Sequence, residues 1–595
     1  MRCQRLSRYV ALAAIPLVIA SCADGTFLIE ELGNNSNIRQ ETLPGTYRGG
    51  SGSTTNNPDN GGNGGSGGST PETGTNPTTI ALASDVEVHP LYPDKGSFSL
   101  AFSGARVGIA AVSSLNAKQT MNFQLDWNGA GARYQAQAAE TSADEPSASH
   151  ESRERRIAEH IRSLPRPAAA GTYQTQAGTT WAKNERRTFS VPLYDAQGRA
   201  TYVQVAADAW FVEDSAKGKF IIWVADDSID RSVVTQQKVD ALGAEIRDRI
   251  YAADVNLFGA DTTMAQNNAA SAANRIEMAD DYVHFLFSRR VDKWDGTANS
   301  SDGTLGFFTL GDLVPYASNP NSNRAKLLYI ASSAMAEGRS LGDLHATIAH
   351  EFQHLLFSCH RVRAVGLSGH MDEFGSQKLA WLNEGLSMLA MFANGNGPDG
   401  ANPSPSVFRQ IRNYLSNPGA FSLTTFFNQG AVGSKEDAYG MAALYLQYVR
   451  DRLGDEGIRA FHTFNNGGSE DATDLADRVM RARNTSMGAM FADFSAALAL
   501  DGTGALDILP TELRARYSIS GVNLRGNYAG KISGLRLNEQ RALQGPAADT
   551  RTSANLSLLP YSASFLLQSN LASTAGLKVS NLSSTGYGTR LILQK

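Results

Sequence analysis

Two imidazoles and a carboxylate occupy one short motif, His350-Glu351-Phe352-Gln353-His354. Residues four apart lie on one face of a helix, about 6 Å from each other, so His350 and His354 can both bind one zinc ion. Glu351 directly follows the first histidine and can act as general base on a water that the metal activates. The motif therefore predicts metal-assisted hydrolysis.

A catalytic zinc ion needs a third protein ligand, and several residues compete for this role. Glu384 lies 30 residues after His354, on a separate strip of an apolar helical pattern, and would complete a site with one open position. His360 is expected near the C-terminus of the first helix, where its side chain points about 120° away from that of His354. Glu384 is favoured because a flexible loop is a poor platform for the remaining candidates: His370, Asp372 and Glu373.

Two helices must hold these ligands. Ser340 and Asp343 form a capping-box pattern, so the first helix is expected to begin there. Its buried stripe has apolar residues at spacings of three, four and seven: Leu344, Ile348, Leu355, Cys359 and Val362. Residues 361–377 contain three glycines and predict a loop that reverses the chain. A second, antiparallel helix would then present Glu384 to the histidines.

The sequence HEFQHLL followed by WLNEGLS resembles the hyicolysin-type peptidases, within the gluzincin class of zinc proteases. The similarity spans roughly residues 200 to 450 and is strongest over residues 345–392. It includes three upstream segments: residues 224–259, 306–312 and 327–330. The resemblance implies a zinc endopeptidase in which Glu351 is the catalytic base and three residues bind zinc: His350, His354 and Glu384.

One position departs from the thermolysin-like pattern Asn-Glu-x-x-Ser-Asp of that class. Asn383, Glu384 and Ser387 match it, whereas Met388 stands where the aspartate is expected. The carboxylate that orients a histidine ligand in that class must then come from elsewhere or be absent. The developing oxyanion needs a further donor, and our candidate is Tyr439, at the start of another helical pattern. A tyrosine at such a position commonly serves packing alone.

Residues 326–330 predict a strand directly before the motif helix. An edge strand at this place would pair with an extended peptide through backbone hydrogen bonds. We therefore expect a protein or peptide substrate in extended conformation. Core packing is the competing role for the apolar residues of the strand, Leu327 and Tyr329.

The N-terminus is expected to direct export. Three arginines precede an apolar run at residues 9–20, which is too short to span a bilayer. The run leads into Ala20-Ser21-Cys22, which resembles a bacterial lipobox and predicts lipidation of Cys22; ordinary signal-peptidase cleavage is the alternative. Residues 49–78 are almost wholly Gly, Ser, Thr, Asn and Pro, as in a flexible tether. We expect a protein that is lipid-anchored to the cell membrane or outer membrane, outside the cytoplasm.

The order of strand and helix patterns predicts an α+β protein. A zincin-like peptidase domain, with a mixed sheet in front of a helical bundle, is expected between small β domains. Its first strands are expected at residues 201–205, 220–224 and 282–287. The predicted division is a signal peptide at 1–21, a tether at 22–78, a small β domain at 79–130, a linker with a charged helix at 131–172, the zinc metallopeptidase domain at 173–500, and a C-terminal β-sandwich at 501–595.

Bulk properties narrow the function classes. The formal net charge of −5 gives no reason to expect nucleic-acid binding. With Cys3 removed and Cys22 lipidated, Cys359 stands alone, so no intramolecular disulfide is expected. The leading hypothesis is a membrane-anchored, zinc-dependent endopeptidase. The alternative is a non-catalytic surface binding or adhesion lipoprotein on a peptidase-like fold.

Overall fold

The structure is a computed structural model. It describes residues 79–91, 97–115, 121–130, 149–166, 179–194, 199–228, 233–271, 275–292, 305–336, 339–424, 437–465, 471–533, 535, 540–550, 553–581 and 587–595. The predicted signal peptide, the tether and Cys22 lie outside these residues. Among the described residues, no helix is both long and apolar enough to cross a membrane.

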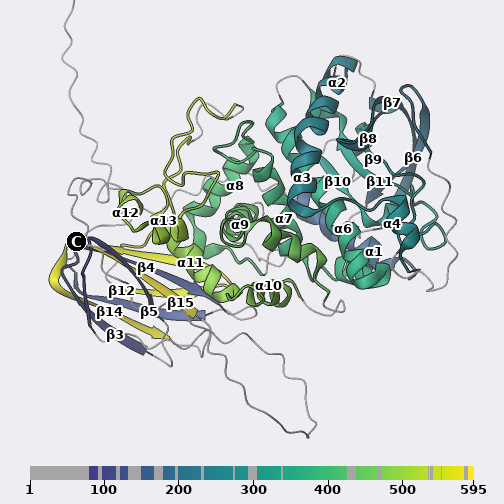
Figure 1. The fold of residues 1–595 in the computed structure, drawn as a ribbon. Helices are drawn as coiled ribbons and strands as arrows, with labels where there is room; N and C mark the ends of the chain where they lie inside the picture. The colour runs from purple at the N-terminus through teal and green to yellow at the C-terminus, as the bar shows by residue number, and fades with distance from the viewer. Residues whose placement is uncertain are drawn as a thin grey trace, which may run out of the picture.

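Three parts lie side by side along the molecule (Figure 1). A β-sandwich occupies one end, a six-stranded sheet with its helices occupies the other, and further helices fill the space between them (Figure 1). This mixture of helices and sheets agrees with the predicted α+β class.

The six-stranded sheet has the strand order β10-β11-β9-β8-β7-β6. Its members are β6 (Arg186–Tyr194), β7 (Ala200–Ser215), β8 (Gly218–Ala225), β9 (Val283–Ser288), β10 (Gly306–Phe308) and β11 (Lys326–Ala331). Strands β8, β9 and β11 run parallel, and the remaining neighbours pair antiparallel. The three strands predicted at the start of the peptidase domain are confirmed, because β7, β8 and β9 contain them within one residue.

Helices pack on one side of this sheet through an aromatic stack. Phe220 of β8 stacks on Tyr251 with ring centroids 6.2 Å apart, and Tyr251 stacks on Phe352 at 5.2 Å. A β-carbon on Gly243 would lie 2.5 Å from the Phe211 ring of β7, so glycine permits a close approach there. The helices concerned are α2 (Gln236–Glu245), α3 (Tyr251–Phe258) and α6 (Leu341–Gly375). The stack fixes α6, which carries the metal-binding motif, against the sheet.

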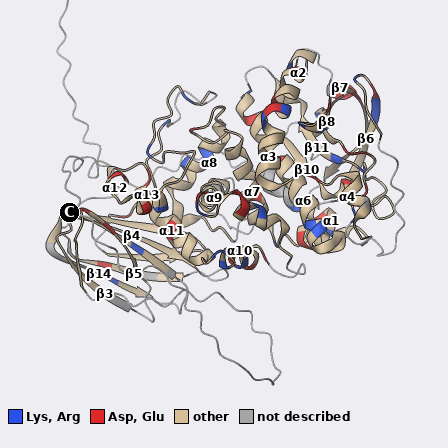
Figure 2. Ribbon diagram, viewed as in Figure 1, with Lys and Arg blue, Asp and Glu red and all other residues tan. Residues whose placement is uncertain are grey.

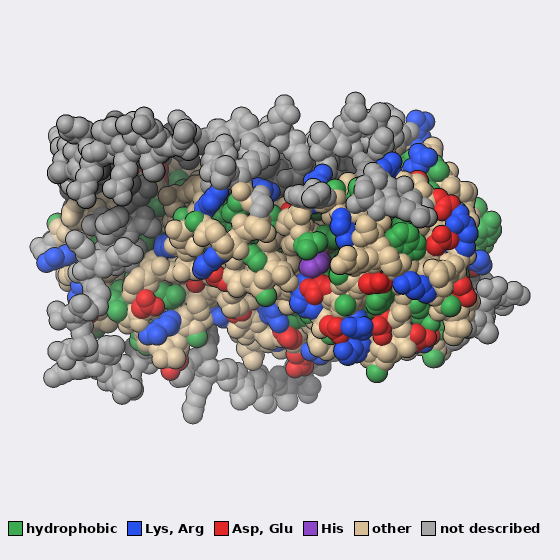
Figure 3. Space-filling model, turned by 90° about the horizontal axis from the view of Figure 1, so that it is seen from above, with side chains coloured by type: hydrophobic (Ala, Val, Ile, Leu, Met, Phe, Trp, Pro, Cys, Tyr) green, Lys and Arg blue, Asp and Glu red, His purple; other side chains and the backbone are tan. Residues whose placement is uncertain are grey.

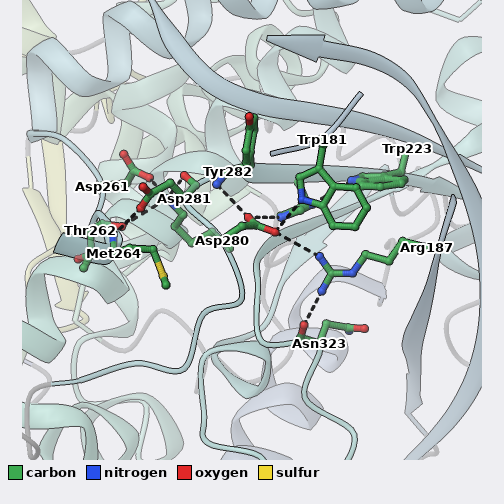
Figure 4. Close-up of polar contacts among 12 residues, drawn as sticks. Trp181, Arg187, Trp223, Asp261, Thr262, Met264, Asp280, Asp281, Tyr282 and Asn323 are labelled. Atoms are coloured by element: carbon green, nitrogen blue, oxygen red, sulfur yellow. Dashed lines mark hydrogen bonds and ion pairs between the residues drawn. The ribbon is translucent and has the colours of Figure 1, made fainter. Parts of the chain in front are cut away.

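A buried polar network lies around Asp280, where the chain enters β9 (Figure 4). The Trp181 indole donates to Asp280 Oδ2 at 2.9 Å, and His284 Nε2 lies 2.9 Å from Asp280 Oδ1. Arg187 approaches the same carboxylate to 3.7 Å and donates to the Asn323 carbonyl at 2.6 Å. These contacts join the segment before β6 to the start of β9.

The β-sandwich is built from both ends of the described chain. Its strands are β1 (Thr79–Ala81), β2 (Val86–Leu91), β3 (Ser97–Ser103), β4 (Val107–Ser114), β5 (Met121–Ala130), β12 (Ser553–Leu558), β13 (Ala563–Gln568), β14 (Leu571–Asn581) and β15 (Tyr587–Gln594). One sheet has the order β1-β3-β14-β5-β12 and the other β13-β4-β15-β2. The two separate β domains expected at 79–130 and 501–595 are therefore wrong: together they make one sandwich.

Strand pairing gives the physical reason for this correction. β14 lies between β3 and β5, and β15 lies between β2 and β4, so neither end of the chain completes a sheet alone. The apolar residues between the sheets come from both segments, as Leu125 and Trp127 pack with Leu577 and Leu591. The first part of the expected C-terminal domain instead carries helices α12 (Gly504–Asp507) and α13 (Thr511–Tyr517).

The sandwich is bonded to the helices beside it through α11 (Met487–Leu500). Arg590 of β15 is buried and donates to Asp493 Oδ1 at 2.7 Å, while Arg516 donates to Oδ2 of the same carboxylate at 2.9 Å. Ser113 of β4 and Ser495 of α11 hydrogen-bond at 2.7 Å. The other helices of this middle part are α7 (Ala380–Ala393), α8 (Pro405–Ser416), α9 (Asp437–Thr463) and α10 (Ala472–Arg481).

Helix α1 (Ser149–Ser163) confirms the charged helix expected within residues 131–172, but its packing does not fit a linker. Ile157 and Ile161 are fully buried, and the Tyr202 hydroxyl lies 2.7 Å from His160 Nε2. Arg162 donates to the Gly375 carbonyl at the end of α6. The many charged residues of α1 made its buried apolar residues difficult to recognise from the sequence. The helix packs against the end of the molecule that contains the six-stranded sheet.

Acidic and basic side chains are interspersed along the described chain (Figure 2). On the face seen in Figure 3, both signs alternate with apolar and uncharged polar side chains over the described surface. Such mixing accords with the small net charge of −5.

Helix α6 begins as predicted, with Ser340 as its N-cap. The Ser340 hydroxyl accepts a hydrogen bond from the Asp343 backbone N–H at 3.2 Å. Replacing Ser340 with alanine removes this acceptor and is expected to lower the free energy of unfolding by about 1 kcal/mol. Thermal or urea unfolding measures the change, and Ser340→Asp, which keeps an acceptor, should stay near the wild type. Equal losses in both variants would contradict the capping role.

Candidate metal centre

Helix α6 presents both histidines of the motif from one face. His350 and His354 are one helical turn apart, and each is only 4% exposed. Their rings meet edge to face with centroids 4.7 Å apart, and their Nε2 atoms lie 3.1 Å from each other. Two nitrogens that face each other at this distance leave room for a shared ion, as the spacing of the residues predicted.

Helix α7 brings Glu384 to the same point. Glu384 Oε2 lies 3.3 Å from His350 Nε2, and Oε1 lies 3.6 Å from His354 Nε2. Ligand atoms of all three residues lie within 4.8 Å of one another, and all three side chains are buried. The candidate third ligand named from the sequence is therefore the one that the fold brings to the histidines.

The geometry can be compared with what zinc requires. Two ligand atoms bound tetrahedrally at about 2.1 Å from zinc are separated by about 3.4 Å. The Nε2–Nε2 separation of 3.1 Å and the distance of 3.3 Å from His350 Nε2 to Glu384 Oε2 are close to this value, and His354 Nε2 lies 3.6 Å from the other carboxylate oxygen. Two imidazoles and one carboxylate are also the donor set of catalytic zinc sites that keep one position open. The donor set and the closeness of its atoms fit a zinc ion.

The two predicted catalytic residues also lie at this centre. Glu351 follows His350 on α6 and is 2% exposed, so its carboxylate is held in a recessed environment. Tyr439, near the start of α9, is 5% exposed, and its ring centroid lies 6.4 Å from that of His350. The structure thus brings four residues named from the sequence together, His350, His354, Glu384 and Tyr439, and Glu351 is their neighbour in the chain. The chemical roles of Glu351 and Tyr439 remain predictions.

The competing third ligands lie elsewhere. His360 lies in the first arm of α6, six residues before the interruption at Gly366, so its expected place near the end of the first helix is confirmed. Its ring packs against that of His462, with centroids 5.6 Å apart. Burial lowers the pKa of His360, which favours a neutral ring.

The reversal of the chain expected within residues 361–377 is confirmed, but helix and not loop flanks it. The helical conformation is interrupted at Gly366, whose φ of 80° and ψ of 160° favour glycine, and two helical arms meet there. A buried cluster holds the two arms of the bend together: Arg361 Nε donates to Glu373 Oε2 at 3.1 Å, and His370 Nδ1 lies 3.2 Å from the same oxygen. Asp372 is at the surface, where Arg166 donates to it at 2.8 Å. The sequence indicated the role of the glycine, but it did not indicate the ion pair between Arg361 and Glu373.

A recess adjoins the candidate metal ligands. It is formed by α1, both arms of α6 and the start of α7, and its cavity volume is about 40 Å³. Its walls combine apolar groups with the polar side chains next to the centre: Ala158, Phe357, Phe374, Leu379, Asn383 and Glu384.

Three residues beside the ligands were not assigned a role from the sequence. Ser387 lies 3.0 Å from His354 Nδ1 and donates to Gln353 Oε1, and Gln353 Nε2 lies 3.2 Å from His462 Nε2. Ser387 and Gln353 stand within the motifs, so their position could have identified them. His462 lies on α9, 108 residues after His354, and only the tertiary fold brings it here.

A buried carboxyl group joins α3 to the end of the second ligand helix. Asn394, the C-cap of α7, donates to Asp254 Oδ1 at 2.6 Å. Burial raises the pKa of Asp254 well above its ordinary value, although Asn394 and Arg249 act in the opposite direction. The side chain is therefore expected to hold its proton in the folded protein at pH values where the unfolded chain has lost it.

Replacing Asp254 with asparagine is expected to change how stability depends on pH. Because the folded state binds the proton more tightly, wild-type stability falls as pH rises from about 4 toward the folded pKa. Asparagine has no proton to lose, so the variant should gain melting temperature relative to the wild type between about pH 5 and about pH 8. Melting curves at both pH values test this. A constant difference between the two proteins would contradict a raised pKa.

Comparison with known proteins gives only one distant structural similarity. No family model and no curated protein matches the chain. Among solved structures, an M1 zinc metallopeptidase from Deinococcus radiodurans, a mutant bound to a Tyr-Ser-Ala substrate, aligns with 13% sequence identity and a TM-score of 0.24. The alignment covers 50% of this chain and 48% of that one, so it spans about half the length of the enzyme. Since this TM-score is too low to assign a fold, the chemistry of the centre rests on its own residues.

Proposed function

We propose that the chain is a zinc-dependent endopeptidase of the gluzincin class, similar to the hyicolysin-type peptidases and anchored outside the cytoplasm by a lipid on Cys22. The convergence of His350, His354 and Glu384 from two helices supports the metal site most strongly. The motif sequences support the class, and the lipobox-like segment supports export and anchoring. We further propose the zincin-like arrangement for the sheet, α6 and α7.

The residues of the centre divide the work of peptide hydrolysis. His350, His354 and Glu384 would hold zinc, which when bound polarises a carbonyl and acidifies a water molecule. Glu351 would take a proton from the attacking water and pass it to the leaving amine. The Tyr439 hydroxyl would donate to the substrate oxygen as negative charge develops there. The burial of all five side chains strengthens these electrostatic interactions.

Residues 326–330 were expected to form an edge strand that pairs with an extended substrate, and the structure places them differently. That segment is strand β11, but it lies between β10 and β9 and is not an edge. Among the described strands, the edge on this side is β10, and a β-carbon on its Gly306 would lie 2.9 Å from Thr347 of α6. We propose that an extended peptide approaches the centre along β10 beside α6.

Metal analysis together with a cleavage assay tests the proposed function. The purified protein should contain one zinc ion per chain and cleave an unfolded protein substrate. A chelator should stop the cleavage, and added zinc should restore it. Zinc bound without cleavage of any unfolded protein would instead favour the non-catalytic binding lipoprotein. A protein with neither zinc nor activity would contradict the proposal entirely.

A further inference from the structure

Gln377 has a backbone conformation that suits glycine. It follows the last turn of α6 with a φ of 56°, in the left-handed region. Its N–H donates to the Phe374 carbonyl at 3.0 Å, and the N–H of Lys378 donates to the Glu373 carbonyl at 3.2 Å. Such a pair of bonds closes a helix around a left-handed residue, where glycine is favoured because it has no β-carbon. The turn alone therefore does not explain why a long polar side chain stands at this position.

The side chain of Gln377 lines the recess beside Glu384. Among the described residues, no hydrogen bond holds its carboxamide. The recess is also lined by Asn383, whose Oδ1 is buried and has no hydrogen-bond partner within the described part of the chain. His370 and Glu373 line the recess too, but they contact each other, with Nδ1 and Oε2 3.2 Å apart. Two amide side chains with unused hydrogen-bonding groups thus share a recess with one of the proposed metal ligands.

The recess has the size and polarity that buried water requires. Its volume of about 40 Å³ gives room for about three water molecules, because each needs about 10–15 Å³. Asn383 Oδ1 and the Glu384 carboxylate only accept hydrogen bonds, whereas Gln377 Nε2 donates. A water molecule that accepts from Gln377 can therefore donate one proton to Asn383 and the other to Glu384. Gln377 thus supplies a donor that directs the protons of such a water toward the ligand.

We propose that Gln377 is a positioning residue of the metal centre, which orients the Glu384 carboxylate through water held in the recess together with Asn383. The inference rests on the proposed zinc site. Carboxylates that bind a metal are themselves held by hydrogen bonds, and the loss of such a partner lowers metal affinity. The left-handed glutamine then lowers the stability of the turn and raises the affinity of the centre for zinc.

Two substitutions separate the side chain of Gln377 from its backbone. Gln377→Gly removes the carboxamide and relieves the left-handed conformation, whereas Gln377→Ala removes the carboxamide and keeps the β-carbon. Asn484→Gly is the matched control, because Asn484 has a φ of 60° and the same pair of hydrogen bonds after α10, but is exposed. The zinc dissociation constant of each full chain, first freed of metal, is measured by competition with a chromophoric chelator. The melting temperature is measured on the metal-free protein.

We expect both Gln377 variants to bind zinc about 10-fold more weakly than the wild type, and Asn484→Gly to bind it equally well. The metal-free Gln377→Gly protein should melt about 1–2 °C above the wild type, whereas Gln377→Ala should gain no stability. Higher stability together with weaker zinc binding is a combination that a purely structural role of the side chain does not produce.

Four outcomes would overturn the inference. Unchanged zinc affinity in both Gln377 variants would remove the positioning role and leave the proposed peptidase intact. Affinity lost in Gln377→Gly but kept in Gln377→Ala would assign the effect to a more flexible turn. A loss of the same size in Asn484→Gly would show that glycine at any such turn weakens the centre. A wild-type protein that binds no zinc would remove the metal site itself, and with it both the inference and the proposed function.

Discussion

Replacing Glu351 with glutamine is expected to lower kcat by about 10²- to 10⁴-fold while zinc stays bound. Glutamine has nearly the same shape as glutamate but cannot take a proton from water. The three proposed ligands are unchanged, and Glu351 is not among the atoms that converge on the ion. The loss should therefore appear in kcat, with little change in the zinc content of the purified variant.

The control for this prediction is Asp372→Asn. It makes the same acid-to-amide change on the same helix, at a side chain that is 62% exposed and bonded to Arg166. We expect its activity to match the wild type. Steady-state kinetics on an unfolded protein substrate and zinc analysis of each variant check both expectations. Proteolysis retained by the Glu351 variant would exclude Glu351 as the base.

The local part of the site could be predicted from the sequence because it depends on helix geometry. Four-residue spacing places His350 and His354 on one face wherever the helix forms, and Ser340 marks where it begins. The apolar stripe of the second segment likewise orients Glu384 toward the first helix. These inferences need only the period of a helix and the polarity of side chains.

The parts that could not be predicted depend on contacts between distant segments. The glycines predicted that the chain reverses near Gly366, but not that both sides are helical or that Arg361 and Glu373 join the two arms. The sandwich combines strands from both ends of the described chain, and alternating patterns do not reveal which strands pair. His462 reaches the centre only because α9 packs beside α6. Such long-range pairings are set by packing and leave no periodic signal.

Replacing Glu384 with alanine is expected to weaken zinc binding by about 100-fold and to abolish activity at limiting zinc. One ligand contributes roughly 3 kcal/mol of the free energy of binding at a protein zinc site, which corresponds to this factor. The carboxylate is also the one ligand that α7 supplies, so its loss leaves two imidazoles on a single helix. Zinc titration by chelator competition measures the change.

The variant that separates Glu384 from its competitor is His360→Ala. The His360 ring packs against His462 and lies outside the group of convergent ligand atoms. Its removal should cost some stability through lost packing and leave zinc affinity unchanged. Because both variants shorten a buried side chain, a general loosening of the fold would affect them alike, whereas a ligand role affects only one. Zinc affinity lost in His360→Ala and kept in Glu384→Ala would move the third ligand from α7 to α6 and contradict the two-helix metal site.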